Sequence, residues 1–151
     1  MNVGCTPATV TEPKVSSISK EVEAREAIRS ILFDQRTHYI GNQTFTTSLK
    51  NPSTMNSKME TPNYTYRIKP KPSKEKGVVI TATPRQPGLR SFTGVAFAIA
   101  SGKDKQTMSE ICETTKPSKT APKAPAAPQR INQMIQCPVG SKSSMSFLAA
   151  Q

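Results

Sequence analysis

Aromatic residues are scarce in this sequence. Tryptophan is absent from the 151 residues, aromatic residues contribute 5%, and the apolar fraction is 34%. An average globular protein is roughly 45–50% apolar, a figure that also counts glycine. The chain holds 13 prolines, a share well above the roughly 5% that is usual. This composition argues against a fully folded, helix-rich domain and predicts a small aliphatic core with disordered ends.

Long apolar runs are missing as well. No stretch approaches the roughly 20 apolar residues of a membrane-spanning helix, and residues 1–11 contain no export signal. The segment Asn2-Val3-Gly4-Cys5 has a faint similarity to the end of a lipoprotein signal, but the apolar run that such a signal needs is not there. The sequence therefore predicts neither a membrane-spanning helix nor a secretory leader in these residues.

The residues that most catalysis requires are also few. His38 is the single histidine, and Asp34 and Asp104 are the only aspartates. Nucleotide-binding and zinc-protease motifs do not occur. We interpret His38 as a residue of the last helical turn, where a positive charge suits the helix dipole. The sequence therefore predicts no enzymatic activity, no cofactor, no metal and no small-molecule substrate.

The cysteine spacing gives no metal or redox motif. Cys5, Cys112 and Cys137 lie far apart and form no C-x-x-C pair. In an oxidising compartment, pairing of Cys112 with Cys137 would loop the basic tail back onto the rest of the fold and stabilise it by about 3 kcal/mol. Cys5 would then remain free or modified. The alternative is three unrelated thiols, and the sequence leaves both interpretations open.

One amphipathic helix is predicted near the beginning, over about residues 16–40. Five apolar residues recur on one side at 3.6 residues per turn: Ala24, Ile28, Ile31, Leu32 and Tyr39. Three others lie off this stripe: Ile18, Val22 and Phe33. Ser17 or Ser19 is the expected N-cap and Gly41 the expected C-cap. A single helix cannot bury its own stripe, so we expect a sheet to cover it.

Strand patterns follow the helix. Four β-branched or alternating segments are the predicted strands: 63–68, 77–83, 92–99 and 108–113. Gln86-Pro87-Gly88-Leu89 fits a type II turn between two of them. Tyr64 and Tyr66 share one face, and we interpret them as packed under the helix instead of stacking on bases. The order predicts an α+β fold with one helix on an antiparallel sheet of about four strands.

The two ends of the chain are expected to differ from this domain. Residues 1–15 read as a flexible lead-in, residues 16–116 as the α+β domain, and residues 117–151 as a low-complexity basic tail. The part rich in Pro, Ala and Lys, residues 117–128, has too little apolar surface to pack and is expected to be disordered. A weak helical pattern at Ile131, Met134 and Ile135 marks a short C-terminal element.

Positive charge is concentrated in the second half of the domain. The chain has a net charge of +11, and residues 61–116 hold 10 basic and 4 acidic groups. The basic run at residues 69–76 is either an ordinary solvated loop or a loop that binds anions with salt-sensitive affinity. The candidate polyanion- or partner-binding residues are Lys69, Lys71, Lys74, Lys76, Arg85 and Arg90.

The order of several segments is similar to a known family. The helix with Glu23-Ala24-Arg25 is followed by Asn63-Tyr64-Thr65-Tyr66, by residues 79–84, by residues 88–95 and by Ile111-Cys112-Glu113. This order resembles the bacterial type IV pilin-like G/H family of minor pilins and pseudopilins over about residues 18–113. The block from Thr81-Ala82-Thr83-Pro84 to Ser91-Phe92-Thr93-Gly94 carries the most specific part of the resemblance.

The resemblance implies a pilin headgroup in which a sheet wraps a helix, with no catalytic residues to transfer. Its expected role is structural: pilus or secretion-filament assembly, or surface attachment. The implied partners are other pilin-like subunits or envelope assembly proteins, and the implied location is the periplasmic or extracellular side of the cell envelope, with membrane anchoring in a longer native form. The competing hypothesis is a basic module that binds nucleic acid or another anionic surface, based on the net charge and the Lys/Pro segments.

Overall fold

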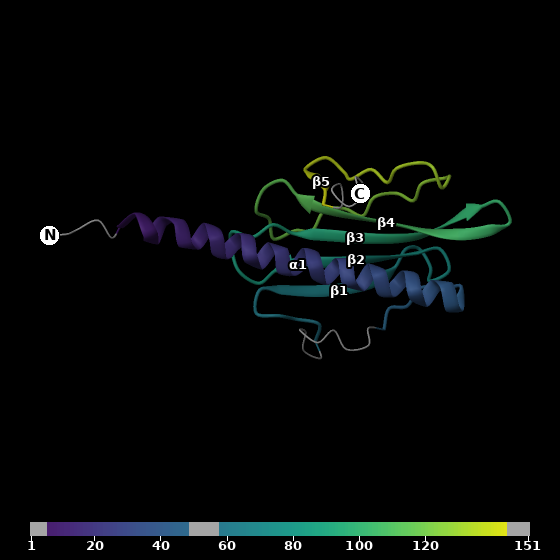
Figure 1. The fold of residues 1–151 in the computed structure, drawn as a ribbon, viewed down its shortest axis with the longest axis horizontal. Coiled ribbons are helices and arrows are strands. Elements are labelled where there is room, and N and C mark those ends of the chain that lie inside the picture. Colours follow the sequence, from purple (N-terminus) through teal and green to yellow (C-terminus); the bar gives the residue numbers. More distant parts are fainter. Residues whose placement is uncertain (1–5, 49–57, 145–151) are drawn as a thin grey trace.

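The computed structural model describes residues 6–48 and 58–144, and for residues 6–16 it describes the course of the helix alone. The elements in chain order are α1 (Thr6–Asn42), β1 (Tyr64–Pro70), β2 (Gly77–Pro84), β3 (Phe92–Ser101), β4 (Asp104–Thr114) and β5 (Ser141–Ser143). Each strand pairs antiparallel with the next, so the sheet order is β1-β2-β3-β4-β5. Helix α1 crosses one face of this sheet (Figure 1). The predicted α+β architecture is confirmed, with five strands described instead of about four.

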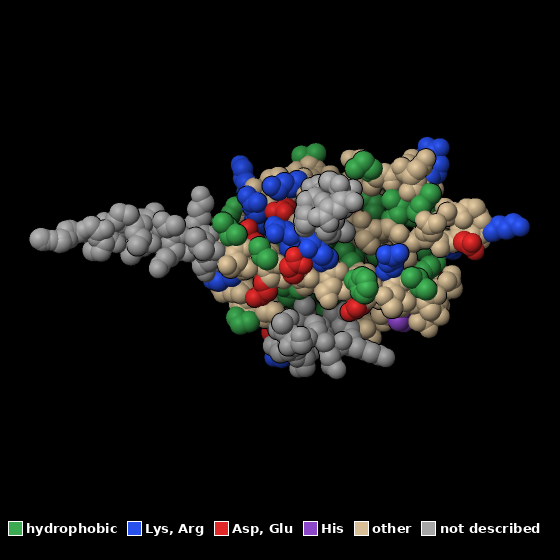
Figure 2. Space-filling view, in the orientation of Figure 1, with side chains coloured by type: hydrophobic (Ala, Val, Ile, Leu, Met, Phe, Trp, Pro, Cys, Tyr) green, Lys and Arg blue, Asp and Glu red, His purple; other side chains and the backbone are tan. Residues whose placement is uncertain are grey.

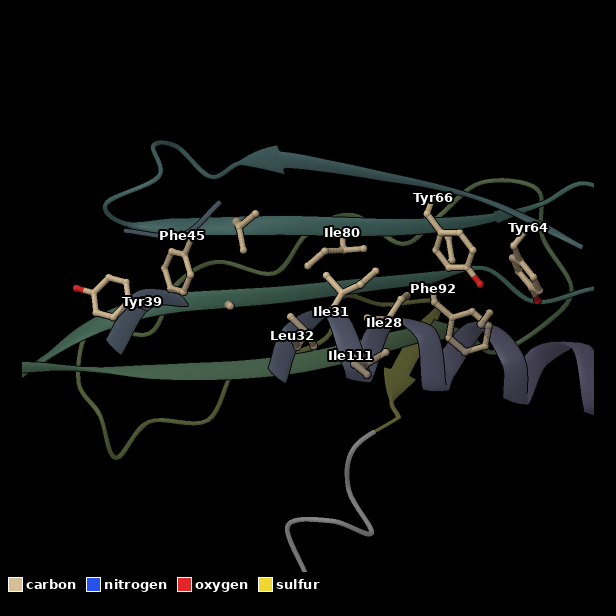
Figure 3. Packing of buried hydrophobic residues seen from close by; sticks show 14 of the residues in the cluster. Ile28, Ile31, Leu32, Tyr39, Phe45, Tyr64, Tyr66, Ile80, Phe92 and Ile111 are labelled. Atoms are coloured by element: carbon tan, nitrogen blue, oxygen red, sulfur yellow. The ribbon is translucent and has the colours of Figure 1, made fainter. Parts of the chain in front are cut away.

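The core lies between α1 and the face of the sheet that it crosses, called here the inner face. All five residues of the predicted helix stripe are buried there, and they pack against inner-face side chains that include Ile80, Phe92 and Ile111 (Figure 3). Tyr64 and Tyr66 lie in the same layer, as predicted. Burial of one such aliphatic or aromatic side chain contributes roughly 1.5–3 kcal/mol. Ile18, Val22 and Phe33 stay exposed, so the sequence identified both sides of the helix correctly.

The ends of α1 differ from the prediction. The helix begins at Thr6, so Ser17 and Ser19 are interior residues and not caps, and residues 6–15 are helical where a flexible lead-in was expected. Pro7 is compatible with this start because the first turn needs no bonded N–H groups. At the other end, Gln43 takes the left-handed conformation (φ 59°) and its N–H donates to the Tyr39 carbonyl at 2.8 Å. The left-handed residue that ends the helix is therefore Gln43 and not Gly41. Residues 1–5, with Cys5, lie outside the described residues.

The predicted strands are present, and β4 is longer than expected. It begins at Asp104, directly after the turn at Gly102, whose φ of 65° suits glycine. The polar residues at its start carry no apolar pattern, yet they pair with β3 through register pairs such as Ile99 with Gln106. The turn before β3 has Gly88 at φ 84°, as a type II turn requires.

The segment from residue 117 to residue 140, called here the strap, covers the other face of the sheet, the outer face. Ile135 is buried against Val95, Phe97 and Ile99, with Ala124 and Ile131 packed beside them. Thr93 Oγ1 donates to the Pro122 carbonyl at 2.6 Å, and Ser118 N–H donates to the Leu89 carbonyl at 2.9 Å. The structure therefore corrects the expected disorder of this segment, and residues 131–135 contain a turn at 131–132 and no helix. The chain then returns as the short strand β5.

Candidate functional site

The basic loop between β1 and β2 is well fixed. Lys71 N–H donates to the Gly77 carbonyl at 2.8 Å, and Gly77 N–H donates back to the Ser73 carbonyl at 2.9 Å. A Cβ at Gly77 would lie 2.5 Å from the Lys71 carbonyl oxygen, so this closure requires glycine. The carbonyl of Lys74 accepts from Phe45 N–H, which ties the loop to the end of α1. The loop therefore presents its exposed lysines on a rigid frame: Lys69, Lys74 and Lys76, with Lys71 half-buried.

The two arginines of the candidate set lie at the opposite end of the sheet. Arg85 follows β2 and donates from Nη1 to the Thr61 carbonyl at 2.8 Å. Arg90 precedes β3 and contacts Glu113 Oε2 through Nη1 at 3.3 Å. Strand β2 separates these arginines from the lysine loop by its 8 residues, which corresponds to about 25 Å of extended chain. The structure therefore groups the four lysines but does not join them to the arginines.

A second basic turn lies beside the lysine loop. Strand β3 continues past the register pair Gly77 with Phe97 to the turn at Gly102, so the β3–β4 turn projects at the same end of the sheet. Lys103 and Lys105 are exposed at this turn, next to the acidic Asp104. Sequence reasoning missed this grouping because the two loops are about 30 residues apart and only the sheet register brings them to one end.

A buried carboxylate joins the helix to the far end of the sheet. Glu113, on β4, is 5% exposed, and its two oxygens contact Arg25 Nη2 and Arg90 Nη1, each at 3.3 Å. Ser144 Oγ donates to the same carboxylate at 2.9 Å, and the Arg25 guanidinium lies 5.6 Å from the centre of the Phe92 ring. These groups satisfy the buried charge, so the cluster is a structural tie between α1, β4 and the end of β5. The alternating residue pattern of this strand in the sequence did not predict the cluster.

Cys112 and Cys137 form a disulfide in the structure, and the two cysteines are 25 positions apart in the sequence. Cys112 lies on β4 and is fully buried, whereas Cys137 lies at the end of the strap. The bond therefore fastens the strap to the sheet at the point where the chain turns toward β5. In this arrangement the segment between the two cysteines loops back onto the outer face of the sheet.

Two titratable side chains in or beside the core, His38 and Tyr64, hydrogen-bond to backbone carbonyls. His38 Nδ1–H donates to the Thr44 carbonyl at 2.8 Å, just beyond the end of α1. Tyr64 Oη donates to the Arg90 carbonyl at 2.7 Å. Burial raises the pKa of both Tyr64 and Tyr66 well above the usual value for a phenol. Within residues 6–48 and 58–144, no three His, Cys, Asp or Glu side chains gather as metal ligands would.

A long N-terminal helix that lies across an antiparallel sheet is an α+β arrangement of the pilin-like type. A family model described as type IV pilin-like G and H matches residues 21–138, and the chain belongs to this family. No curated protein and no solved structure matches it. The match includes most of the strap, up to residue 138, together with Cys137, and these lie beyond the part of the chain where the segment order is similar.

Family membership indicates the general class of the protein. Members are generally non-enzymatic and structural, which suggests contacts with other pilin subunits and a location in the cell envelope or outside the cell. In the part of the chain that the structure describes, no helix has both the length and the apolar character needed to cross a bilayer.

Proposed function

We propose that the protein acts in the assembly of a pilus or a secretion filament, or in the attachment of such a filament to a surface, by docking to other pilin-like subunits. The observation that carries this proposal is the course of α1, whose N-terminal part projects beyond the ends of the strands (Figure 1). With 37 residues the helix is about 55 Å long. Its buried apolar stripe begins at Ala24, and Lys20 and Glu21 make the first polar contacts, to the Gln86 side chain and the Arg90 N–H. The proposed contact with a neighbour therefore uses the part of α1 that precedes Lys20 and the exposed side of the turn that follows it.

The exposed apolar side chains next to this projection support the docking role. Ile18 and Val22 are one helical turn apart, on the same side of α1, and are 54% and 41% exposed. Branched apolar side chains in this position gain free energy when another subunit removes them from water. The proposed contact is therefore helix against helix, with the sheet and strap turned away from it.

Substitution of these two residues tests the proposal in cells that produce the protein. The double variant Ile18→Asp, Val22→Asp should lose its place in sheared filament preparations while the purified variant keeps the wild-type circular dichroism spectrum. Val139→Asp is the matched control because Val139 is fully exposed on the strap. The proposal fails when the protein never cofractionates with filaments, or when the double variant cofractionates as well as the control.

Binding to an anionic polymer is the second candidate function. The observation that favours it is the grouping of the lysine loop with Lys103 and Lys105 at one end of the sheet. Single- or double-stranded DNA is a suitable probe, and binding tighter than micromolar with a steep loss of affinity as salt rises would support this function. The variant Lys74→Glu, Lys76→Glu should weaken it, whereas absence of binding at low salt removes this candidate.

A further inference from the structure

The two edges of the sheet are not equivalent. Along β1, Tyr66 N–H donates to the Met59 carbonyl at 2.9 Å, and the Tyr64 carbonyl accepts from Thr61 N–H at 2.9 Å. The chain that precedes β1 therefore already occupies much of that edge. At the other edge, β5 pairs only with the last residues of β4, Cys112 to Thr114. The greater part of β4 has no strand beside it among the described residues.

Backbone geometry shows which groups of β4 face this open edge. Ser144 N–H donates to the Ile111 carbonyl at 2.7 Å, so the backbone of Ile111 points toward β5. Strand backbones alternate in direction, so the N–H and C=O groups of three preceding residues point to the same side: Lys105, Thr107 and Ser109. Ala98, the β3 partner of Thr107, agrees with this assignment because its N–H donates to Lys76 on the β2 side.

A groove lies directly over this edge. It has a volume of about 950 Å³ and runs between the C-terminal half of α1 and the inner-face side chains of Lys105, Thr107 and Ser109. The helix wall contributes Phe33 and Ile40, each 66% exposed. Figure 2 shows apolar and basic side chains interspersed on this face of the molecule. The groove therefore combines an apolar wall with a row of backbone donors and acceptors that pair with no strand among residues 6–48 and 58–144.

The charged lining of the groove is mainly basic. Its basic residues are Arg29, Arg36, Lys103 and Lys105, and its acidic residues are Glu75 and Asp104. Because Arg29 already pairs with Glu26 at 2.6 Å, the remaining charges of the lining are three cations against two carboxylates, a net charge of +1 to which Arg36 contributes the cation on the helix wall. A ligand that carries carboxylates gains from this field, whereas a basic ligand is repelled.

We propose that the groove over the open edge of β4 binds an extended acidic peptide of a partner protein, which adds a strand next to β4. Its backbone bonds to Lys105, Thr107 and Ser109, its carboxylates face Arg36 and Lys105, and one apolar side chain contacts Phe33 and Ile40. This mode is strand addition, in which main-chain hydrogen bonds give affinity and alternate side chains give specificity. It goes beyond the filament role, because it uses neither the projecting turns of α1 nor the exposed Ile18 and Val22.

The test uses the full chain and a fluorescent seven-residue probe, Thr-Glu-Thr-Leu-Thr-Glu-Thr, whose Glu, Leu and Glu side chains share one face when it is extended. The expected result is saturable binding by fluorescence anisotropy. The matched probe with Lys in place of both Glu residues should bind about a hundredfold more weakly or not at all, as expected for loss of two charge-assisted contacts. Equal binding of the two probes overturns the proposal.

Two variants separate the groove from the rest of the basic surface. Arg36→Glu should weaken binding of the acidic probe about tenfold, whereas Arg67→Glu on β1 should leave it unchanged because Arg67 is exposed at the other edge. Thr107→Pro removes one edge-facing N–H without breaking a bond to β3 and should also weaken binding. The proposal is contradicted if Arg67→Glu loses binding, or if Arg36→Glu binds the acidic probe as well as the wild-type protein does.

Hydrogen exchange gives a readout that does not depend on a variant. The probe should slow amide exchange at Lys105, Thr107 and Ser109, while Gln106 and Met108, whose amides face β3, stay as they were. Protection confined to other residues overturns the proposal. A second result would also overturn the proposal: the protein binds no probe, self-associates as its concentration rises, and loses this self-association in Thr107→Pro. The edge of β4 would then be occupied by a second copy of the chain. Normal filament incorporation in cells is compatible with either result, so this test and the filament test fail separately.

Discussion

Gly94 on β3 lies directly beneath Ile28 of α1. A Cβ atom at Gly94 would be 2.5 Å from Ile28 Cγ2 and 3.3 Å from Leu32 Cδ1. The absence of a side chain at this position lets the helix approach the backbone of the sheet, and neighbouring strand residues such as Ile80 and Ile111 then enclose Ile28. The contact fixes the distance between helix and sheet at the centre of the core.

Gly94→Ala should therefore destabilise the protein by about 1–3 kcal/mol, as overpacking of a filled core does. Gly41→Ala is the matched control, because a Cβ there meets nothing within 4 Å and an alanine in a helix is favoured over glycine by roughly 0.5–1 kcal/mol. Denaturant unfolding measures both. The double variant Gly94→Ala, Ile28→Ala should lose less stability than the sum of the two single variants, because the shorter side chain at position 28 leaves room for the new Cβ. Equal stability of the two glycine variants would contradict the contact.

Two neighbouring tyrosines should respond in opposite ways to loss of the hydroxyl. Tyr66 Oη is buried and has no hydrogen-bond partner in the described structure, whereas Tyr64 Oη donates to the Arg90 carbonyl at 2.7 Å. Tyr66→Phe removes an unsatisfied polar group and should be neutral or stabilising by about 1 kcal/mol. Tyr64→Phe leaves a carbonyl without its donor and should cost about 1 kcal/mol. Thermal unfolding compares them, and the opposite order would refute this assignment.

Stability should fall at alkaline pH. Burial, and then the negative charges of Glu21 near Tyr64 and Glu23 near Tyr66, raise the pKa of both phenols in the folded protein. In the unfolded chain a phenol titrates near pH 10. The folded state therefore holds these protons more tightly, and the stability that this contributes is complete below about pH 10 and is lost as the pH rises above that value. Unfolding midpoints measured between about pH 8 and 11 should decline, and less steeply in Tyr66→Phe.

The disulfide should contribute about 3 kcal/mol to stability, given a closed loop of this size. Cys137→Ala is the variant of choice because Cys112 is buried in the sheet. Its unfolding midpoint should match that of the reduced wild-type protein, and added reductant should leave the variant unchanged. Amide exchange should accelerate first in the strap. A variant as stable as the oxidised wild-type protein would show that the strap holds without the bond.

Local patterns predicted the parts of the fold whose residues repeat with a regular period. The helix stripe from Ala24 to Tyr39 and the β-branched strand at residues 77–83 are of this kind, because one buried face is enough to define them. The start of β4 has no such face, since Asp104 to Thr107 are polar and pair only because the preceding turn aligns them with β3. The sequence did not reveal the early start of α1, because it contains Pro7 and Pro13 and prolines usually interrupt a helix.

The candidate site shows the same limit. The lysine loop at residues 69–76 was visible as a run of like charges, but its neighbour at Lys103 depends on the sheet register. The role of Arg90 could not be deduced either, because Arg90 lies in the turn before β3 and its partner Glu113 lies on β4, so the pair forms only after the chain has folded. Sequence reasoning therefore found the charges and not the surface that they form.

The strap also decides where the folding unit ends. A shortened protein that stops at residue 116 would have no cover over Val95, Phe97 and Ile99 and would leave Cys112 without its partner. Such a product should aggregate through the uncovered sheet and oxidise to cross-linked dimers. Fusions and truncations placed beyond Ser144 keep the strap over the outer face of the sheet. The proline-rich segment has the composition of a linker, yet it is a required part of the folded domain.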